Sequence, residues 1–220
     1  MMSFALVTEG DTDQAVLEEI IQTIYLEKTG DEVEIRVVQP LYDETTMSRS
    51  EVFGGWEMLL DFCSNSERIL EALSTNDYLV IQIDTDICEH ERIKIPLTSN
   101  SAPKSSMQLI DEMRAFLESS IPLEVYNTYR ENIIFAIAVH STECWLLPLH
   151  ANREGDKSQI VNCENRLYRA LATQSRKYIK DARNYSEYAK GFRKIKNINM
   201  AKTHNESLRL FVDSLPQPPA

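Results

Sequence analysis

The sequence has little glycine and no long apolar segment. Only 6 of its 220 residues are glycine, which excludes collagen-like and glycine-rich repeat proteins. The longest uninterrupted apolar run covers residues 133–139, whereas a membrane-spanning helix needs about 20 apolar residues. The first residues lack the basic n-region of a secretory signal peptide. These absences indicate a globular protein without a membrane span, and we expect it to be cytoplasmic.

Cysteine is also scarce, and the four cysteines are widely spaced. They are Cys63, Cys88, Cys144 and Cys163, and no two of them form a Cys-x-x-Cys pair. In a reducing compartment such residues are most simply interpreted as free, mostly buried thiols. The chain also lacks the Gly-x-x-x-x-Gly-Lys-Ser/Thr, Gly-x-Gly-x-x-Gly and Gly-x-Ser-x-Gly motifs. ATP hydrolysis, dinucleotide redox chemistry and serine-hydrolase chemistry are therefore not expected here.

Basic residues are in deficit overall but are concentrated in one segment. The chain carries 34 acidic and 23 basic residues, for a net charge of −11. Residues 166–202 contain 11 Lys or Arg against 2 Asp or Glu, so this segment carries +9 and the remainder −20. Such asymmetry indicates an anion-binding region, although exposed Lys and Arg also simply solvate helix faces. The candidate nucleic-acid contacts are Arg176, Lys177, Lys180, Arg183, Lys190, Arg193, Lys194 and Lys196.

Apolar or alternating runs typical of β-strands alternate with helical patterns in the first two thirds of the chain. We expect strands at 3–8, 32–38 (near an edge), 78–83 (central) and 132–139. We expect helices at 13–28, 56–62, 67–73 and 105–117, and from 143 onwards after a Ser141 or Thr142 cap. Loops are expected at 40–55 and 96–104, and after residue 152 only helical spacing is found, at 160–172, 185–195 and 205–215.

This order of elements predicts an α/β fold with a mostly parallel sheet of about four strands flanked by helices. We expect the α/β domain to span residues 1–150. A helical, basic C-terminal lobe would follow over 151–215, and residues 216–220 would form a frayed tail.

Acidic residues follow three of the predicted strands. Glu9 follows the first, Asp84 and Asp86 end the third, and Glu143 comes just after the fourth. The carboxyl ends of parallel strands meet at one edge of a sheet, where α/β proteins bind ligands. Clustered carboxylates repel one another, and Mg²⁺ would neutralise them through a few carboxylates, waters and phosphate oxygens. The sequence therefore predicts a Mg²⁺ or Mn²⁺ site here, with Gly10 and the following helix N-terminus facing the same crevice.

Two of these segments resemble the TOPRIM family, the metal-binding domain of topoisomerases, bacterial primases and OLD-family nucleases. The matching stretches are Phe-Ala-Leu-Val-Thr-Glu-Gly-Asp-Thr-Asp at 4–13 and Leu-Val-Ile-Gln-Ile-Asp-Thr-Asp at 79–86. A third stretch, His-Ser-Thr-Glu-Cys-Trp-Leu-Leu at 140–147, is similar to a segment of small stand-alone TOPRIM proteins tied to phage defence and of OLD-like nucleases. The resemblance covers residues 3–150 and extends loosely into the C-terminal region.

The resemblance implies a role for each acid. Glu9 would transfer a proton or bind metal, Asp84 and Asp86 would hold Mg²⁺, and Glu143 would complete a second metal position. Some relatives carry a further acid two residues after the Asp-x-Asp pair, where this sequence has Cys88. The expected activity is Mg²⁺-dependent phosphodiester cleavage of nucleic acid, in phage defence or DNA repair. Since the chain lacks the ATPase half of OLD-type nucleases, a separately encoded ATPase is an expected partner.

Three other interpretations remain open at this point. The chain could be a catalytically inactive TOPRIM module that binds a partner protein or nucleic acid. A zinc site could form from Cys88, His90, His140 and Cys144, two Cys and two His that follow predicted strands. The Asp-Thr-Asp sequence at 84–86 also occurs as a metal motif in sugar-nucleotide transferases.

Overall fold

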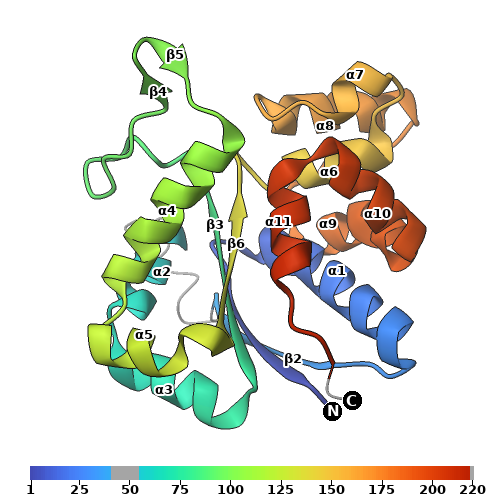
Figure 1. Cartoon of the computed structure of the whole chain (residues 1–220). Coiled ribbons are helices and arrows are strands. Elements are labelled where there is room, and N and C mark those ends of the chain that lie inside the picture. Colours follow the sequence, from blue (N-terminus) through green and yellow to red (C-terminus); the bar gives the residue numbers. More distant parts are fainter. Residues whose placement is uncertain (41–54, 219–220) are drawn as a thin grey trace, which may run out of the picture.

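The protein is built around one four-stranded sheet in which every neighbouring pair of strands is parallel (Figure 1). The computed structural model describes residues 1–40 and 55–218. The strand order is β2-β1-β3-β6, which confirms the predicted edge position of the second strand and the central position of the third. The bounds are Ser3–Val7 for β1, Glu34–Gln39 for β2, Tyr78–Asp84 for β3 and Ile133–Ala138 for β6.

Alternation along each strand sends side chains to two separate cores, one on each face of the sheet. On β3, Leu79, Ile81 and Ile83 pack on one face and Val80 packs on the other. Helices cover both faces (Figure 1), as a parallel sheet requires because both of its faces are apolar. The prediction of a helix-flanked α/β architecture is therefore confirmed.

The first face is covered by helices from the middle of the chain. They are α2 (Gly55–Cys63), α3 (Ser66–Thr75), α4 (Ser106–Ser120) and α5 (Leu123–Tyr129). The second face is covered by α1 and by helices that follow β6. They are α1 (Asp11–Thr29), α6 (Glu143–His150), α8 (Cys163–Thr173), α9 (Ala182–Ala189), α10 (Ile195–His204) and α11 (Glu206–Ser214). The short helix α7 (Glu154–Lys157) packs against α6 and contributes no buried residue.

The helices after residue 150 share their core with the sheet. Trp145 of α6 is fully buried, its ring stacks on Phe211 of α11 with centroids 5.5 Å apart, and its Nε1 donates to Ser207 Oγ at 2.8 Å. The start of the predicted tail also lies against α1, because the Tyr25 hydroxyl donates to the Pro216 carbonyl at 2.8 Å. The C-terminal helices therefore form part of the layer that positions the sheet, and the boundary near residue 150 stays a prediction.

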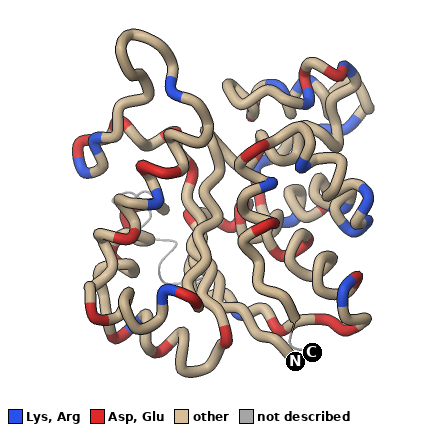
Figure 2. Tube along the Cα trace, viewed as in Figure 1, with Lys and Arg blue, Asp and Glu red and all other residues tan. Residues whose placement is uncertain are grey.

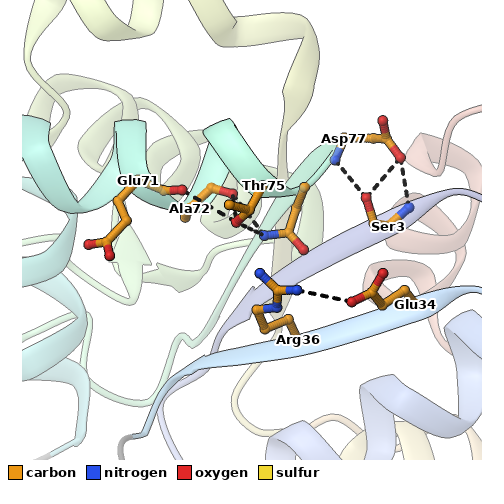
Figure 3. A network of polar contacts seen from close by, with 8 residues as sticks. Ser3, Glu34, Arg36, Glu71, Ala72, Thr75 and Asp77 are labelled. Carbon is orange, nitrogen blue, oxygen red and sulfur yellow. Dashed lines mark hydrogen bonds and ion pairs between the residues drawn. The ribbon is translucent and has the colours of Figure 1, made fainter.

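Polar contacts join the amino ends of β1 and β3 (Figure 3). Ser3 donates from its backbone N and its hydroxyl to Asp77 Oδ2, at 2.8 and 2.9 Å, and the Asp77 N–H donates back to the Ser3 hydroxyl at 3.0 Å. This reciprocal pair helps to fix the register of the two central strands.

Several local predictions need correction. The predicted loop at 96–104 contains an antiparallel hairpin of β4 (Thr98–Ser99) and β5 (Ala102–Pro103), because Asn100 and Ser101 adopt the positive φ angles of a tight hairpin turn. The single helix predicted at 185–195 is instead divided among α9, a 3-10 turn at Lys190–Arg193 and α10. Helix α5 was not predicted. Most of the predicted 40–55 loop, residues 41–54, lies outside the described residues.

The prediction of four free thiols is wrong for two cysteines. Cys144 and Cys163 form a disulfide with their Cα atoms 5.1 Å apart, whereas Cys63 and Cys88 are free and buried. The pair forms because α8 packs against α6 and brings together residues that are 19 positions apart in sequence. Sequence spacing alone carries no sign of this packing.

Among the described residues, none of the helices combines the length and the hydropathy that crossing a membrane requires.

Replacing Phe211 by alanine tests the shared core. We expect Phe211→Ala to lower the free energy of unfolding by about 3–5 kcal/mol, because it opens a cavity beside Trp145. Leu123→Ala is the control, since Leu123 is 71% exposed and surface truncations usually change stability by less than about 0.5 kcal/mol. Urea denaturation measures both. Equal unfolding midpoints for the two variants would contradict a core shared by α6, α11 and the sheet.

Candidate active site

A pocket of about 460 Å³ opens at the carboxyl end of the sheet. All four acids predicted from sequence line it: Glu9 after β1, Asp84 and Asp86 at the end of β3, and Glu143 after β6. The structure thus brings together residues that are up to 134 positions apart. Its wall also includes residues that the sequence prediction did not name as site residues, among them Asp13, Gly55 and Glu164.

Gln82 holds two of these acids in place. It lies two residues before Asp84 on β3, so both side chains point to the same face of the sheet. Gln82 Nε2 donates to Asp84 Oδ1 at 2.9 Å, and Gln82 Oε1 accepts from the Glu9 backbone N–H at 3.0 Å. This fully buried amide therefore ties the end of β1 to the carboxylate of β3. Sequence analysis assigned it no role, since a lone Gln within an apolar strand carries no specific signal.

Thr142 does not cap the helix that it precedes, contrary to one predicted alternative. Its hydroxyl donates to Asp84 Oδ1 at 3.1 Å, and α6 has no side-chain cap. The Thr142 backbone N–H also points to Asp84 Oδ2, at 3.4 Å. Thr142 is fully buried, so its hydroxyl satisfies a buried carboxylate rather than a helix end.

Glu9 and Asp13 lie at the junction of β1 and α1. Glu9 Oε2 accepts from the Asp84 backbone N–H at 3.4 Å. Asp13, in the first turn of α1, is only 7% exposed. Side chains in a helix tilt toward its N-terminus, which directs Asp13 back to the end of the sheet. The signal for Asp13 was present in the sequence as the last residue of the Glu-Gly-Asp-Thr-Asp stretch.

Glu143 is held by residues of the C-terminal helices. The Tyr185 hydroxyl donates to Glu143 Oε1, and Lys180 Nζ lies 3.3 Å from the same oxygen. Lys180 Nζ also lies 3.3 Å from Glu164 Oε2. Lys180 was predicted to contact nucleic acid from the basic segment, and the structure places it in the wall of the acidic pocket.

The loops after β3 and β6 position Asp86 at the exposed rim. The Asp86 backbone N–H donates to the His140 carbonyl at 3.1 Å, and the His140 N–H donates to Thr85 Oγ1 at 2.7 Å. His140 has a positive φ of 60°, which turns the chain sharply after β6 toward α6. These hydrogen bonds tie the ends of β3 and β6 to each other.

Gly55 permits a close approach to Glu9. A Cβ atom at position 55 would lie 1.9 Å from the Glu9 carbonyl oxygen and 2.9 Å from its carbonyl carbon. No side chain fits at that distance, so the first residue of α2 must be glycine for α2 to reach the pocket wall.

Burial, with repulsion between neighbouring carboxylates added, raises the pKa of most of these carboxyl groups. Burial, followed by repulsion from Asp13 and Asp86, raises the pKa of Glu9 to about 8. Burial likewise raises the pKa of Asp13 to about 6, with repulsion from Glu143 added. Burial and the surrounding carboxylates raise the pKa of Asp84 well above its usual range. In the absence of a cation, the site therefore favours the protonated, neutral form of these carboxyl groups.

Glu143 is the exception. Burial alone would raise its pKa, but hydrogen bonds from Ser141 and Tyr185 and the charge of Lys180 outweigh burial and lower the pKa. Glu143 is therefore a stable carboxylate within the pocket.

The donor set suits a hard divalent cation better than zinc. The clustered side chains offer carboxylate oxygens, which Mg²⁺ uses one or two at a time together with water and phosphate oxygens. Within the described ranges, no three His, Cys, Asp or Glu side chains are arranged to hold an ion by themselves. The zinc alternative is wrong, because Cys144 is bonded to Cys163. Cys88, at the position where some TOPRIM proteins have an acid, is buried and is not part of the pocket wall.

The predicted nucleic-acid contacts divide into two groups. Basic residues are numerous on the side of the molecule formed by α8–α10 (Figure 2). Besides Lys180, two of the candidates pair with acids: Lys190 with Glu187 and Arg193 with Glu19. Across residues 1–40 and 55–218, the other five form no ion pair; these are Arg176, Lys177, Arg183, Lys194 and Lys196.

No protein-family model, curated protein or solved structure matches this chain.

Without divalent cations, we expect stability to fall as the pH rises from 6.5 to 8. Glu9 has a pKa of about 8 in the folded protein against an ordinary value of 4.5. The folded state therefore binds more protons over this range, and raising the pH favours unfolding. Urea unfolding in EDTA at several pH values measures the effect. Glu9→Gln should flatten the dependence, whereas exposed Glu27→Gln should leave it as in the wild type. The same slope in Glu9→Gln as in the wild type would contradict the raised pKa.

The close approach at Gly55 predicts a second effect. Gly55→Ala forces α2 away from the Glu9 backbone, so we expect a lower unfolding midpoint and weaker Mn²⁺ binding by isothermal titration. Gly155→Ala is the matched control, because a Cβ there meets no atom within 4 Å. Wild-type Mn²⁺ affinity in Gly55→Ala would show that this contact does not shape the pocket.

Proposed function

We propose that the chain is a Mg²⁺- or Mn²⁺-dependent nuclease, or the nuclease subunit of an assembly, of the TOPRIM type. The observation that supports this proposal is the meeting of Glu9, Asp84, Asp86 and Glu143 at one pocket beyond three strand ends. Asp13 adds a further carboxylate to the same wall. An α/β scaffold of this kind typically binds its ligand at this edge of the sheet.

Asp84 and Asp86 are the residues that would hold the cation, and Asp13 and Glu143 line the same pocket. When bound, a divalent cation activates water and neutralises charge on a phosphodiester. Gln82 and Thr142 keep the Asp84 carboxylate fixed through three hydrogen bonds. The protein therefore orients its ligand oxygens before the cation arrives.

Glu9 is the candidate for proton transfer. A carboxyl group with a pKa of about 8 exchanges protons readily near neutral pH, which is what general acid–base catalysis needs. With a cation in the pocket the pKa of Glu9 would fall, and Glu9 would then act as a base toward water. Lys180, which is 51% exposed, presents positive charge to a phosphate that enters the pocket.

Nucleic acid is the proposed substrate. Lys177, Arg183, Lys194 and Lys196 are exposed and are available to contact the phosphate backbone, which makes binding weaken as salt rises. A separately encoded ATPase partner and a role in phage defence or DNA repair belong to the same proposal through the sequence resemblance. A cytoplasmic location is proposed separately, from the lack of a long apolar run in the sequence.

One observation favours a second candidate function. Lys180 bridges Glu143 and Glu164 and so neutralises part of the acidic pocket without a metal ion. The same fold could then serve as a catalytically inactive module that binds nucleic acid or a partner protein.

Cleavage assays separate the two candidates. With Mg²⁺ or Mn²⁺, we expect the wild type to cleave plasmid or single-stranded substrates and Asp84→Asn to lose at least 100-fold in rate, since Asp84 holds the cation. Asp31→Asn, on an exposed loop, is the control and should retain full activity. Equal inertness of wild type and Asp84→Asn on every substrate would overturn the nuclease proposal. Mn²⁺ binding that is also absent by titration would favour the inactive module.

A further inference from the structure

Four tyrosines form a connected cluster between α8 and α9. Tyr168 meets Tyr178 edge to face at 6.3 Å between ring centroids, and Tyr178 stacks on Tyr188 at 6.1 Å. Tyr185 lies 5.6 Å from Tyr188. Tyr185 and Tyr188 are buried, whereas Tyr168 is 55% exposed. The cluster thus presents one aromatic ring to solvent on a rigid base, which we call the tyrosine platform (Tyr168, Tyr178, Tyr185 and Tyr188).

Hydrogen bonds connect this platform to the acidic pocket. The Tyr178 and Tyr185 hydroxyls are 2.7 Å apart, and the Tyr185 hydroxyl donates to Glu143 Oε1. Tyr168 lies one helical turn after Glu164, a residue of the pocket wall. The exposed ring of Tyr168 and a residue of the pocket wall are therefore neighbours on the same helix.

The segment that carries Tyr178 also carries positive charge. The Tyr188 hydroxyl donates to the Lys177 carbonyl at 3.0 Å and accepts from the Ile179 N–H at 2.9 Å, which fixes the backbone of this segment. Lys177 is exposed and belongs to the group without an ion pair. From residue 164 to residue 183 the chain has six Lys or Arg and two acids. The net positive charge of residues 164–183 is complementary to a polyanion such as nucleic acid.

We propose that the tyrosine platform binds an unpaired base of single-stranded nucleic acid and leads the adjoining phosphate to the pocket. This inference rests on the proposed function and names its substrate class. An exposed aromatic ring beside cations is the usual arrangement for single-strand binding, because any unpaired base can stack on it. Bases in a duplex are already stacked on their neighbours, so an exposed ring gives no comparable gain there. Tyr168 is a positioning residue in this scheme.

Fluorescence anisotropy with the full chain in EDTA tests the proposal. The probes are a labelled oligo-dT, a labelled oligo-rU and a duplex of equal length. We expect the wild type to bind at least one single strand more tightly than the duplex, and Tyr168→Ala to weaken that binding about tenfold. Tyr168→Phe should keep wild-type affinity because it retains the ring. Leu123→Ala, an exposed apolar truncation on α5, is the control and should not change affinity.

The salt dependence of binding tests whether Lys177 contacts a phosphate group of the strand. Lys177→Gln should reduce the slope of log affinity against log salt concentration by about 0.7, the value for one phosphate contact on a single strand. Tyr168→Ala should leave that slope unchanged, since stacking involves no counterion release. The dT and rU arms decide between DNA and RNA.

Failure of this inference is distinct from failure of the nuclease proposal. Equal affinity of wild type and Tyr168→Ala for single strands, preference for the duplex, or no binding to any probe would overturn the platform. Single-strand binding that depends on Tyr168 would support it even if Mg²⁺ assays show no cleavage, in which case only the nuclease proposal falls.

Discussion

Repulsion among buried carboxylates is the constraint around which this molecule is organised. Seven acidic residues line one pocket, and a buried charge is tolerated only when hydrogen bonds or opposite charges compensate it. Gln82 and Thr142 bond Asp84, and Lys180 and Tyr185 bond Glu143. Under the proposed function, a divalent cation would compensate the remaining carboxylates.

Distant parts of the chain are needed to satisfy that constraint. The strand ends supply the carboxylates, but Lys180 and Tyr185 come from the last third of the sequence. Those residues reach Glu143 because α9 packs against α1 and because α6 and α11 share a core through Trp145 and Phe211. The helical C-terminal region therefore covers the sheet and also supplies the positive charge and the hydroxyl group that stabilise the Glu143 carboxylate.

Much of this arrangement could be predicted from sequence, and the reasons for the misses are specific. Strand ends and period-two alternation located Glu9, Asp84 and Asp86, because apolar runs mark buried strands clearly. The role of Gln82 was missed because it depends on two hydrogen bonds, to the Glu9 backbone and to the Asp84 carboxylate, that no sequence pattern marks. Lys180 and the cystine of Cys144 and Cys163 depend on how helices pack, which no local pattern encodes. The short β4–β5 hairpin depends on two non-glycine residues at positive φ, a turn that composition does not reveal.

The bond between Cys144 and Cys163 has a consequence for the integrity of the chain. It closes a covalent ring of residues 144–163, with Glu143 just before one end and Glu164 just after the other. A protease that nicks this ring would leave two fragments that migrate as one species until a reductant separates them. The acidic residues at the strand ends and Lys180, which pairs with Glu143, would then lie on two polypeptides. The disulfide between Cys144 and Cys163 would be the covalent link between them.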